Sequence, residues 1–325
     1  MDFRLTEDQR DLRRGVRELL ARLFDREALR AALDAPRLDR ELWRELGAAG
    51  FFSLRLPEEE GGVGLGLPEA VLVFEEAGRV LLPGPLVATH VAAGSVPGAA
   101  EGELVVTEAS EGLVPWLDEA DVVLGEVSGA VPVRSVDPLT PLHRVPGVVG
   151  AVGAGSLGPA GAPSVASTLP QALGFARAGG TPIAPVKRLP TTGVAVLLTA
   201  AEQVGSAQAV TDMAVSHARQ RVQFGQVVGG FQAVKHLCAG MLVRTELARA
   251  AVWAASVTGD PVEVAGAKLL ADEAATRNAR DCLQVHGGMG FTWEADVHLH
   301  LKRAWVRAEL RMPAARAEET VAAGL

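Results

Sequence analysis

Four long stretches with helical periodicity follow one another after Pro190, and they constrain the fold more than any other feature of the chain. Short turns such as Gly259-Asp260-Pro261 separate them, so consecutive helices are expected to run antiparallel. Thr292, with Glu294 in the following turn, is expected to cap the last helix. The pattern predicts a four-helix bundle built from residues 192–221, 232–257, 262–286 and 292–309.

The chain in front of the bundle begins with helical patterns. Thr6 and Gln9 have the spacing of a helix cap, and leucines and valines follow at helical intervals. A second helix is expected from Leu38 to Gly50. A third is expected from Pro68 to about Leu82, with the proline in a favoured first-turn position. We therefore expect an N-terminal helical domain over residues 1–98.

The pattern changes at about Glu101, where short valine-rich stretches replace the helical spacing. Ser128-Gly129 is expected to turn a β-hairpin between two of these stretches. Prolines recur up to Lys187 and argue against long helices in this region. We therefore expect a reduced central β domain over residues 99–189, the bundle over residues 190–325, and an α+β multidomain fold.

Composition narrows the classes of function. The formal net charge is −8, which argues against general affinity for nucleic acid. No basic N-terminal segment leads into an apolar run, and no stretch of about 18 apolar residues occurs, so a cytoplasmic protein without a membrane span is expected. Cys238 and Cys282 fall in helical patterns, and we expect both to be reduced and buried.

The stretch between the first two bundle helices combines basic, aromatic and amide side chains with glycine turns. Arg221 closes one helix, and Phe224-Gly225 breaks it. Gly229-Gly230 then turns the chain, and Phe231-Gln232 opens the next helix. Such residues can be ordinary helix punctuation. The same side chains around two glycine turns can also hold an anionic or planar ligand, so the stretch alone leaves both interpretations open.

A second motif, Gln284-Val285-His286-Gly287-Gly288-Met289-Gly290-Phe291, follows at the end of the third bundle helix. With Arg221-x-x-Phe224-Gly225 and Phe231-Gln232 in this order, the chain resembles the acyl-CoA dehydrogenases. The resemblance covers almost the whole chain, because Leu56-Pro57-Glu58-Glu59-Glu60-Gly61-Gly62-Val63-Gly64 and Glu75-Glu76-Ala77-Gly78-Arg79 are also similar to segments of that family.

The resemblance implies flavin adenine dinucleotide (FAD) as cofactor, in tetramers built as dimers of dimers, with each FAD lying across a subunit boundary. An arginine fork suits pyrophosphate oxygens, and glycines at positive φ let backbone N–H groups approach a phosphate. The phenylalanine of the first motif packs against the cofactor in the family. The residues that the resemblance assigns to a neighbour's FAD are Arg221, Phe224, Gln232, Gln284, Gly287 and Gly288.

The catalytic base is missing from its usual place. Dehydrogenation of a thioester needs a dry carboxylate that removes the α-proton while hydride leaves for the flavin. Counted from Gln284, the usual base position falls on Arg311, and an arginine cannot act as this base. The alternative family position falls near Ala195. Glu202, two turns later on about the same face, is the nearby acidic candidate, and a polar residue lining an interface is the competing interpretation.

The flavin side of the β domain is also reduced. The family motif Thr-Glu-Pro-x-x-Gly-Ser-Asp is shortened to Thr107-Glu108-Ala109-Ser110-Glu111-Gly112, and the Trp-x-Thr wall that normally follows is missing. Trp116 comes too soon to replace that wall, and it is expected to pack inside the small domain. The chain is therefore expected to keep contacts to a neighbour's adenine dinucleotide and to lose those for its own flavin.

Two histidines near the C-terminal end do not predict a metal site. His298 and His300 are two residues apart, so their side chains point to different helix faces. With Lys302 and Arg303 they are expected to form a surface or interface stripe. The segment from Trp293 to Ala304 is similar to the ending of actinobacterial members that act on steroid side-chain thioesters. Some of those are α2β2 heteromers in which one chain type lacks the base.

These features favour one hypothesis and leave two alternatives. The leading hypothesis is a base-lacking subunit of a heteromeric acyl-CoA dehydrogenase, whose homologous partner supplies the flavin pocket and the catalytic carboxylate for an acyl-CoA substrate. The first alternative is a self-sufficient homomeric dehydrogenase with Glu202 or another displaced base. The second is a non-enzymatic assembly or binding protein on the same fold.

Overall fold

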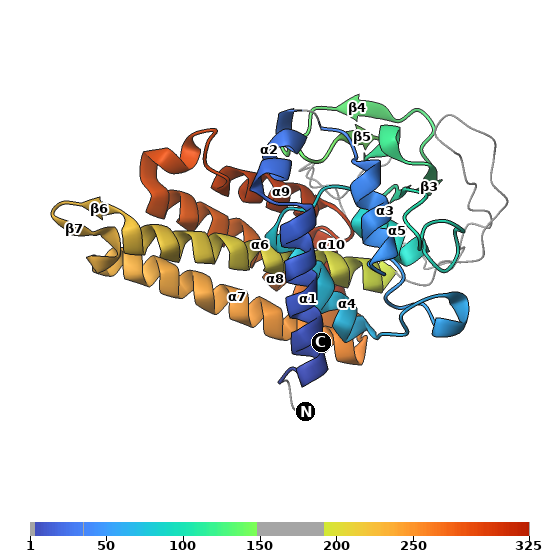
Figure 1. Ribbon diagram of the computed structural model, residues 1–325, viewed down its shortest axis with the longest axis horizontal. Helices are drawn as coiled ribbons and strands as arrows, with labels where there is room; N and C mark the ends of the chain where they lie inside the picture. The colour runs from blue at the N-terminus through green and yellow to red at the C-terminus, as the bar shows by residue number, and fades with distance from the viewer. Residues whose placement is uncertain (1–3, 35, 148–191, 325) are drawn as a thin grey trace, which may run out of the picture.

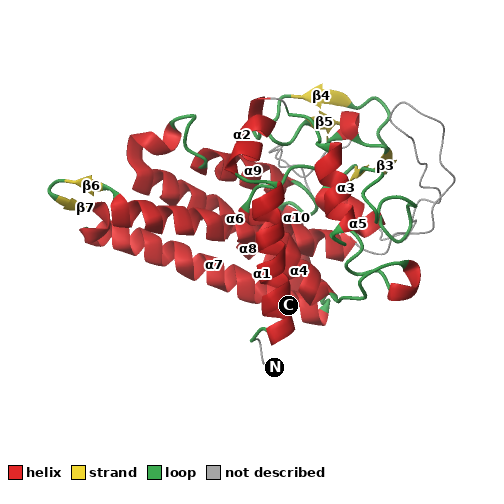
Figure 2. Cartoon of the chain, in the orientation of Figure 1, coloured by secondary structure: helices red, strands yellow, loops and turns green. Residues whose placement is uncertain are grey.

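The computed structural model describes residues 4–34, 36–147 and 192–324, and it consists mainly of helices (Figures 1 and 2). Long helices form the bundle, and shorter helices and strands gather beside one end of it (Figure 1). None of the helices described is both long and apolar enough to cross a membrane. Residues 148–191 of the expected β domain, with its expected boundary at residue 189, lie outside the described residues.

Five helices make up the N-terminal region. They are α1 (Glu7–Leu23), α2 (Arg26–Asp34), α3 (Arg40–Ala48), α4 (Leu67–Arg79) and α5 (Leu86–Ala92), with the 3₁₀ turn η1 (Glu58–Glu60) before α4. The cap predicted at Thr6 is confirmed, because Gln9 N donates to Thr6 Oγ1 at 3.2 Å. Pro68 lies in the first turn of α4, as predicted. The pattern did not predict α2 and α5, because nine and seven residues hold few apolar repeats.

In the described part of the β region, residues 99–147, five short strands form two small sheets. They are β1 (Val106–Glu108), β2 (Leu113–Pro115), β3 (Val122–Leu124), β4 (Val131–Val133) and β5 (Leu142–Arg144), with the 3₁₀ turn η2 (Leu117–Glu119) after β2. β1 pairs in parallel with β3, with Val106 opposite Val122, and β5 pairs antiparallel with both β2 and β4. The hairpin predicted at Ser128-Gly129 is wrong, because the strands on either side lie in different sheets. Ser128 N donates to Glu126 Oε1 at 2.7 Å, a local turn that redirects the chain.

The predicted bundle is confirmed. It consists of α6 (Thr192–Gln220), α7 (Gln232–Thr258), α8 (Pro261–His286) and α9 (Val297–Glu309), and α10 (Ala314–Ala323) follows. Asp260 caps α8 by accepting a hydrogen bond from Val262 N at 2.9 Å. The cap predicted at Thr292 is wrong, because its hydroxyl donates to Met289 O at 2.8 Å and a loop precedes the start of α9 at Val297. α10, which the pattern did not predict, packs against α8.

α4 and α6 pack so closely that their main-chain atoms approach one another directly. A Cβ added to Gly78 would lie 2.0 Å from Glu202 O, and a Cβ added to Gly205 would lie 1.8 Å from Glu75 O. Because a side chain fits at neither position, the two glycines permit a closer approach of the helices than larger residues allow. This contact joins the N-terminal helices to the bundle.

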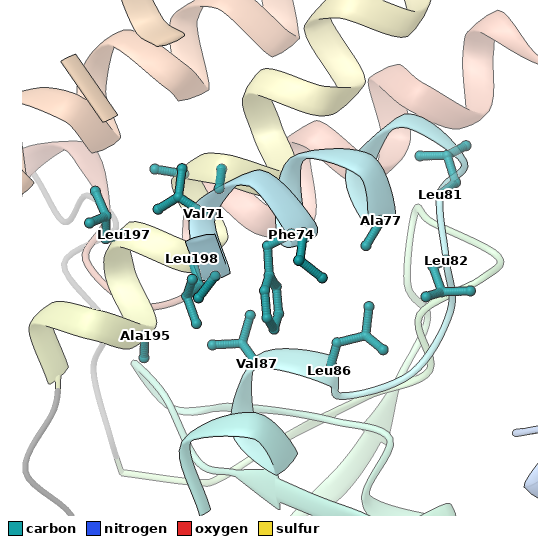
Figure 3. Packing of buried hydrophobic residues seen from close by; sticks show 14 of the residues in the cluster. Val71, Phe74, Ala77, Leu81, Leu82, Leu86, Val87, Ala195, Leu197 and Leu198 are labelled. Carbon is teal, nitrogen blue, oxygen red and sulfur yellow. The ribbon is translucent and has the colours of Figure 1, made fainter. Parts of the chain in front are cut away.

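The main hydrophobic core fills the space between α4, α5 and α6 (Figure 3). The ring of Phe74 points from α4 toward Val87 of α5 and is fully buried. Leu197 and Leu198 contribute from α6. Burial of one such side chain stabilises the fold by about 1.5–3 kcal/mol. The core therefore fixes the first half of α6, whose other end carries the Arg221 motif.

Candidate functional site

A short hairpin projects from the far end of the bundle, between α6 and α7 (Figure 1). It consists of β6 (Val222–Gln223) and β7 (Gln226–Val227), and the 3₁₀ turn η3 (Val228–Gly230) follows. At its tip, Phe224 and Gly225 have φ angles of 53° and 79°, as a two-residue type I′ turn requires. A bulky residue rarely adopts this conformation, and Phe224 is also 88% exposed. Strain and exposure together make the tip a candidate for function.

The second motif lies at the C-terminal end of α8. The helix ends at His286, and the 3₁₀ turn η4 (Gly287–Phe291) follows. Gly287 has φ 60° and ψ −143°, a conformation that favours glycine. Gln284 and Gly288 are exposed, and Phe291 is 75% exposed. An amide side chain, an open glycine backbone and an aromatic ring are therefore all accessible here.

A pair of stacked histidines brings the two motifs to the same end of the bundle. The rings of His217 in α6 and His286 in α8 have centroids 4.1 Å apart and an interplanar angle of 29°. Arg221 N donates to His217 O at 2.8 Å, one turn along the chain from the stack. Burial lowers the pKa of His217, and the neighbouring His286 and Arg221 lower it further. His217 is therefore neutral at pH 7, which suits stacking beside an arginine.

The side chains predicted to bind a cofactor lie exposed at this end. The Arg221 guanidinium forms no hydrogen bond or ion pair with the residues that the structure describes. Gln232 is exposed at the start of α7, where its Nε2 lies 2.9 Å from His236 Nε2. The far end of the bundle thus carries all six predicted residues: Arg221, Phe224, Gln232, Gln284, Gly287 and Gly288.

The usual base position, residue 311, follows the C-terminal end of α9, whereas the η4 turn precedes its N-terminal end. Arg311 and Met312 have φ angles of 53° and 91°, two consecutive non-glycine residues in the left-handed region. The buried Arg311 guanidinium forms an ion pair with Glu108 and donates to Thr199 Oγ1 at 3.4 Å. The Arg311 backbone N donates to Ser110 Oγ at 2.9 Å. Position 311 is therefore bound to the reduced flavin motif.

A second ion pair reinforces the first. Arg316 in α10 lies 2.6 Å from Glu111, another residue of the reduced motif. The two pairs line a cavity of about 320 Å³ between the β region, the start of α6 and the segment before α10. In the sequence, the missing base and the shortened motif are two separate departures from the family pattern. The opposite charges of Arg311 and Glu108, and of Arg316 and Glu111, are the sequence feature that could have connected them.

Glu202, the candidate displaced base, is buried beside α9. Its Oε1 accepts a hydrogen bond from Arg307 Nη2 at 2.7 Å. Burial lowers the pKa of Arg307 to about 10, and the charge of Glu202 opposes this shift, so the guanidinium stays charged at pH 7. The adjoining cavity of about 40 Å³ is large enough for only a few water molecules and has no room for an acyl chain. The contacts favour a structural role for Glu202 inside the chain, as a polar residue between α6 and α9.

The surface stripe predicted on α9 is wrong for most of its members. His300 Nδ1 lies 2.7 Å from Ser206 Oγ, and burial together with two nearby arginines lowers the pKa of His300 to about 3. Arg303 forms a buried ion pair with Asp137. Elements remote in the chain cover α9, α6 at His300 and the β region at Arg303, and a helical pattern alone does not reveal this. Of the four residues expected to be exposed, three are buried and one is half-buried: His298, His300 and Arg303, and Lys302.

The structure also places three residues for which the sequence predicted ordinary packing. Trp116 is buried in the small domain, as predicted. Cys282 is buried and Cys238 is half-buried, and both are free thiols. Burial raises the pKa of Cys282 to about 12, so its thiol is protonated and unreactive at pH 7. Among the described residues, no group of three or more His, Cys, Asp or Glu side chains is arranged to hold a metal ion.

Comparison with known proteins identifies the family. The family model described as "Acyl-CoA dehydrogenase, C-terminal domain" matches residues 193–311, and the corresponding N-terminal domain model matches residues 6–102. The chain is 36% identical to acyl-CoA dehydrogenase IpdE2 of Mycobacterium tuberculosis, over 94% of this chain and 93% of that protein. The chain belongs to the acyl-CoA dehydrogenase family. Acyl-CoA dehydrogenases are oxidoreductases.

Two solved structures share the fold. The ChsE4-ChsE5 complex from Mycobacterium tuberculosis superposes with a TM-score of 0.77 at 22% identity, covering 99% of this chain and 98% of that chain. The Tcur3481-Tcur3483 steroid ACAD gives a TM-score of 0.76 at 23% identity, covering 98% of this chain and 97% of that chain. These likenesses concern the fold, and they confirm the predicted α+β multidomain architecture with helical ends and a small central β region.

FAD is the cofactor of this family. The residues of this chain fit the two halves of FAD differently. At the bundle end, the unpaired Arg221 guanidinium and the open backbone of Gly287-Gly288 suit an anionic pyrophosphate. At the base position, Arg311 already occupies the polar groups of Glu108 and Ser110. Among the residues that the structure describes, the groups at the bundle end are open to an anionic ligand, whereas those around position 311 are already paired with one another.

Proposed function

We propose that this chain is the non-catalytic subunit of a heteromeric acyl-CoA dehydrogenase. It contributes contacts to the adenine side of an FAD that is seated mainly in a homologous catalytic subunit, and that subunit supplies the base. The assembly, an α2β2 tetramer, catalyses α,β-dehydrogenation of an acyl-CoA thioester. A bulky acyl group, such as a steroid side chain, is the proposed substrate class.

The ion pair of Arg311 with Glu108 carries this proposal. A guanidinium stays protonated throughout the physiological pH range, so Arg311 cannot accept the α-proton of a thioester. The two carboxylates nearest to it are not free to replace it. Glu108 pairs with Arg311, and Glu111 pairs with Arg316. This chain therefore has no uncommitted carboxylate among the described residues that line this cavity.

The residues at the bundle end act as a clamp for the neighbour's cofactor, and we call them the adenine clamp. Arg221 would hold the pyrophosphate through charge-assisted hydrogen bonds, and the N–H groups of Gly287-Gly288 would also donate to it. Gln232 and Gln284 would add hydrogen bonds, and the Phe224 ring would pack against the cofactor. When bound, FAD supplies the hydride acceptor for the reaction. The clamp residues bind and orient it, and they move no proton.

The outer face of α7 supports association with a partner. Leu242, Val243 and Leu247 on this face are half-exposed or more. Large apolar side chains gathered on one helix face are typical of an interface. The ChsE4-ChsE5 complex has the same fold, and its name describes an assembly of two different chains. The steroid ACAD Tcur3481-Tcur3483 is likewise named as a pair, and it supports the proposed substrate class.

Co-purification with the products of neighbouring genes, followed by a flavin spectrum, tests the proposal. We expect the chain alone to be colourless, and the assembled complex to be yellow and to lose its flavin absorbance when an acyl-CoA is added. The Arg221→Ala variant should assemble with the partner yet retain less flavin. A chain that is yellow when purified alone and reduces its flavin with acyl-CoA would contradict the proposal.

The variant Glu202→Gln separates this proposal from a self-sufficient enzyme. If Glu202 were the base, the variant would lose turnover completely. We expect the complex to keep its turnover number, because Glu202 pairs with Arg307 inside the chain. Thermal unfolding of the variant chain serves as the control, since loss of the buried pair lowers stability and not chemistry.

A further inference from the structure

Two arginines of α2 hold the loop that joins η4 to α9. Arg26 Nε donates to Asp296 Oδ2 at 2.7 Å, and Arg26 Nη2 donates to Glu294 O at 2.9 Å. Arg30 Nη2 donates to Glu294 O at 2.7 Å, and Arg30 Nη1 donates to Trp293 O. Arg30 also forms an ion pair with the Asp296 carboxylate. The two guanidinium groups therefore bind the backbone and the acidic side chain of one short loop.

The other backbone contacts of this loop are local. Thr292 N donates to Met289 O at 3.1 Å, and Ala295 N donates to Thr292 O at 3.2 Å. These bonds join residues that are close in the chain, so they do not fix the loop relative to the rest of the molecule. Arg26 lies 268 residues before Glu294 in the chain, and its contact does fix the loop. The Asp296 carboxylate is mostly buried, which strengthens its pairing with both arginines.

The ring of Trp293 also contacts α9. It stacks on His298 of α9, with ring centroids 5.1 Å apart and an interplanar angle of 24°. Lys302 Nζ lies 5.1 Å from the centre of the same ring. Arginines from α2 thus bind the loop backbone, while α9 binds its aromatic side chain. The turn before this loop carries Gly287-Gly288 of the adenine clamp.

We infer that Arg26 and Arg30 are positioning residues for the adenine clamp. They act through the loop, whose fixed backbone sets the place and direction of the Gly287–Phe291 turn. Without them the turn would be held from its α8 side alone, so more of it would have to be ordered when FAD binds, and this cost weakens binding. The inference rests on the proposed function, because it assumes that the turn meets a flavin.

An FAD titration of the assembled complex tests the inference. We expect the double variant Arg26→Ala, Arg30→Ala to raise the Kd for FAD about tenfold. Its turnover should fall when FAD is limiting and should recover when FAD is saturating. Asp296→Asn should have a smaller effect, because it keeps the hydrogen bonds to the carbonyl groups of Trp293 and Glu294. Arg14→Ala is the matched control. Arg14 and Arg26 are equally exposed, at 66%, and Arg14 pairs only with Asp11 of its own helix, at 2.6 Å.

A parallel titration with Arg221→Ala separates the possible outcomes. If Arg221→Ala raises the Kd and the double variant does not, the inference is overturned and the proposed function stands. If neither variant raises the Kd, the proposed function fails and the inference fails with it. If the double variant does not fold, the single variant Arg26→Ala decides, because this residue is largely exposed. An equal rise in Kd for Arg14→Ala would also overturn the inference.

Discussion

At position 311 the chain has an arginine where the acyl-CoA dehydrogenase resemblance predicts a carboxylate. This change of charge is matched by the residues that surround position 311. Glu108 and Ser110, from the shortened flavin motif, both bind Arg311. The sequence predicted the missing base, because it depends on one position counted from Gln284. It did not predict the new partners of that position, because they lie about 200 residues away and meet only in the folded chain.

The charge of Arg311 is expected to be needed for stability. Arg311→Glu places like charges beside each other at Glu108 and should lower the free energy of unfolding by about 3 kcal/mol. Adding Glu108→Arg restores opposite charges and should recover a large part of the loss. Chemical denaturation of the two single variants and the double variant measures this coupling. Strictly additive effects would show that the pair is not coupled.

Phe224 is expected to lower the stability of the free chain and to favour the complex. Its φ of 53° costs a bulky residue about 1 kcal/mol, and asparagine tolerates this region better. Phe224→Asn should therefore raise the melting temperature of the chain alone while it weakens FAD binding by the complex. Differential scanning calorimetry and an FAD titration measure the two effects. Val222→Asn, at another exposed position of the same hairpin, is the control.

At the scale of elements, α1 is attached to α4 by a buried carboxylate. Glu76 of α4 accepts hydrogen bonds from Arg13 and Arg17 of α1, both at 2.9 Å from Nε. Burial opposes the charge of Glu76, but the hydrogen bonds from Arg17 and Arg13 and the charges of Arg17 and Arg79 together outweigh it, and the pKa of Glu76 is lowered from its ordinary value of 4.5. The charged form is therefore stabilised by folding.

This pKa shift predicts how stability depends on pH. Because the folded pKa is depressed, the contribution of Glu76 is complete above its unfolded value and is lost as the pH falls through the folded value. Glu76→Gln should lower the free energy of unfolding by about 3 kcal/mol at pH 7. The difference from the unmodified chain should shrink below about pH 4, as both are measured by urea unfolding. A difference that stays constant with pH would contradict this origin.

The elements that the sequence predicted best are those whose apolar repeat is longest. α6, α7 and α8 end within a residue or two of their expected bounds, since many turns of one pattern leave little choice. α2, α5 and α10 were not predicted, because they are short. The turn at Ser128-Gly129 was predicted, but the strands on either side do not pair with each other, since β3 pairs with β1 and β4 pairs with β5. Local turn chemistry does not specify such pairing.

At the scale of the whole molecule, the two ends of α9 lie next to different kinds of site. One end adjoins the exposed adenine clamp, and the other adjoins a cavity lined by ion pairs. The order of helical region, β region and bundle followed from changes in periodicity and punctuation. The burial of His300 and Arg303 did not, because it arises where other elements cover α9: His300 contacts Ser206 of α6, and Arg303 contacts Asp137 of the β region. Sequence periodicity describes single elements, and it does not report which elements cover one another.

The exposed face of α7 is expected to hold the assembly together. Leu247→Asp places a charge at a position that is 57% exposed in the free chain, so the chain itself should keep its melting temperature. The complex with the partner should dissociate at least tenfold more readily, because a charge would be buried in its interface. Sedimentation velocity measures the association. Val136→Asp, at an exposed position of the β region, should leave it unchanged.

The glycine contact between α4 and α6 has a consequence for how the molecule tolerates change. Gly78 and Gly205 set the spacing of the two helices through main-chain atoms alone. The contact therefore sets the closest approach of the two helices, whatever side chains occupy the rest of the core. A single methyl group at either glycine would instead shift α4, and with it α1, which is bound to α4 through Glu76. The position of α4 and α1 against the bundle therefore depends on the absence of a side chain at Gly78 and Gly205.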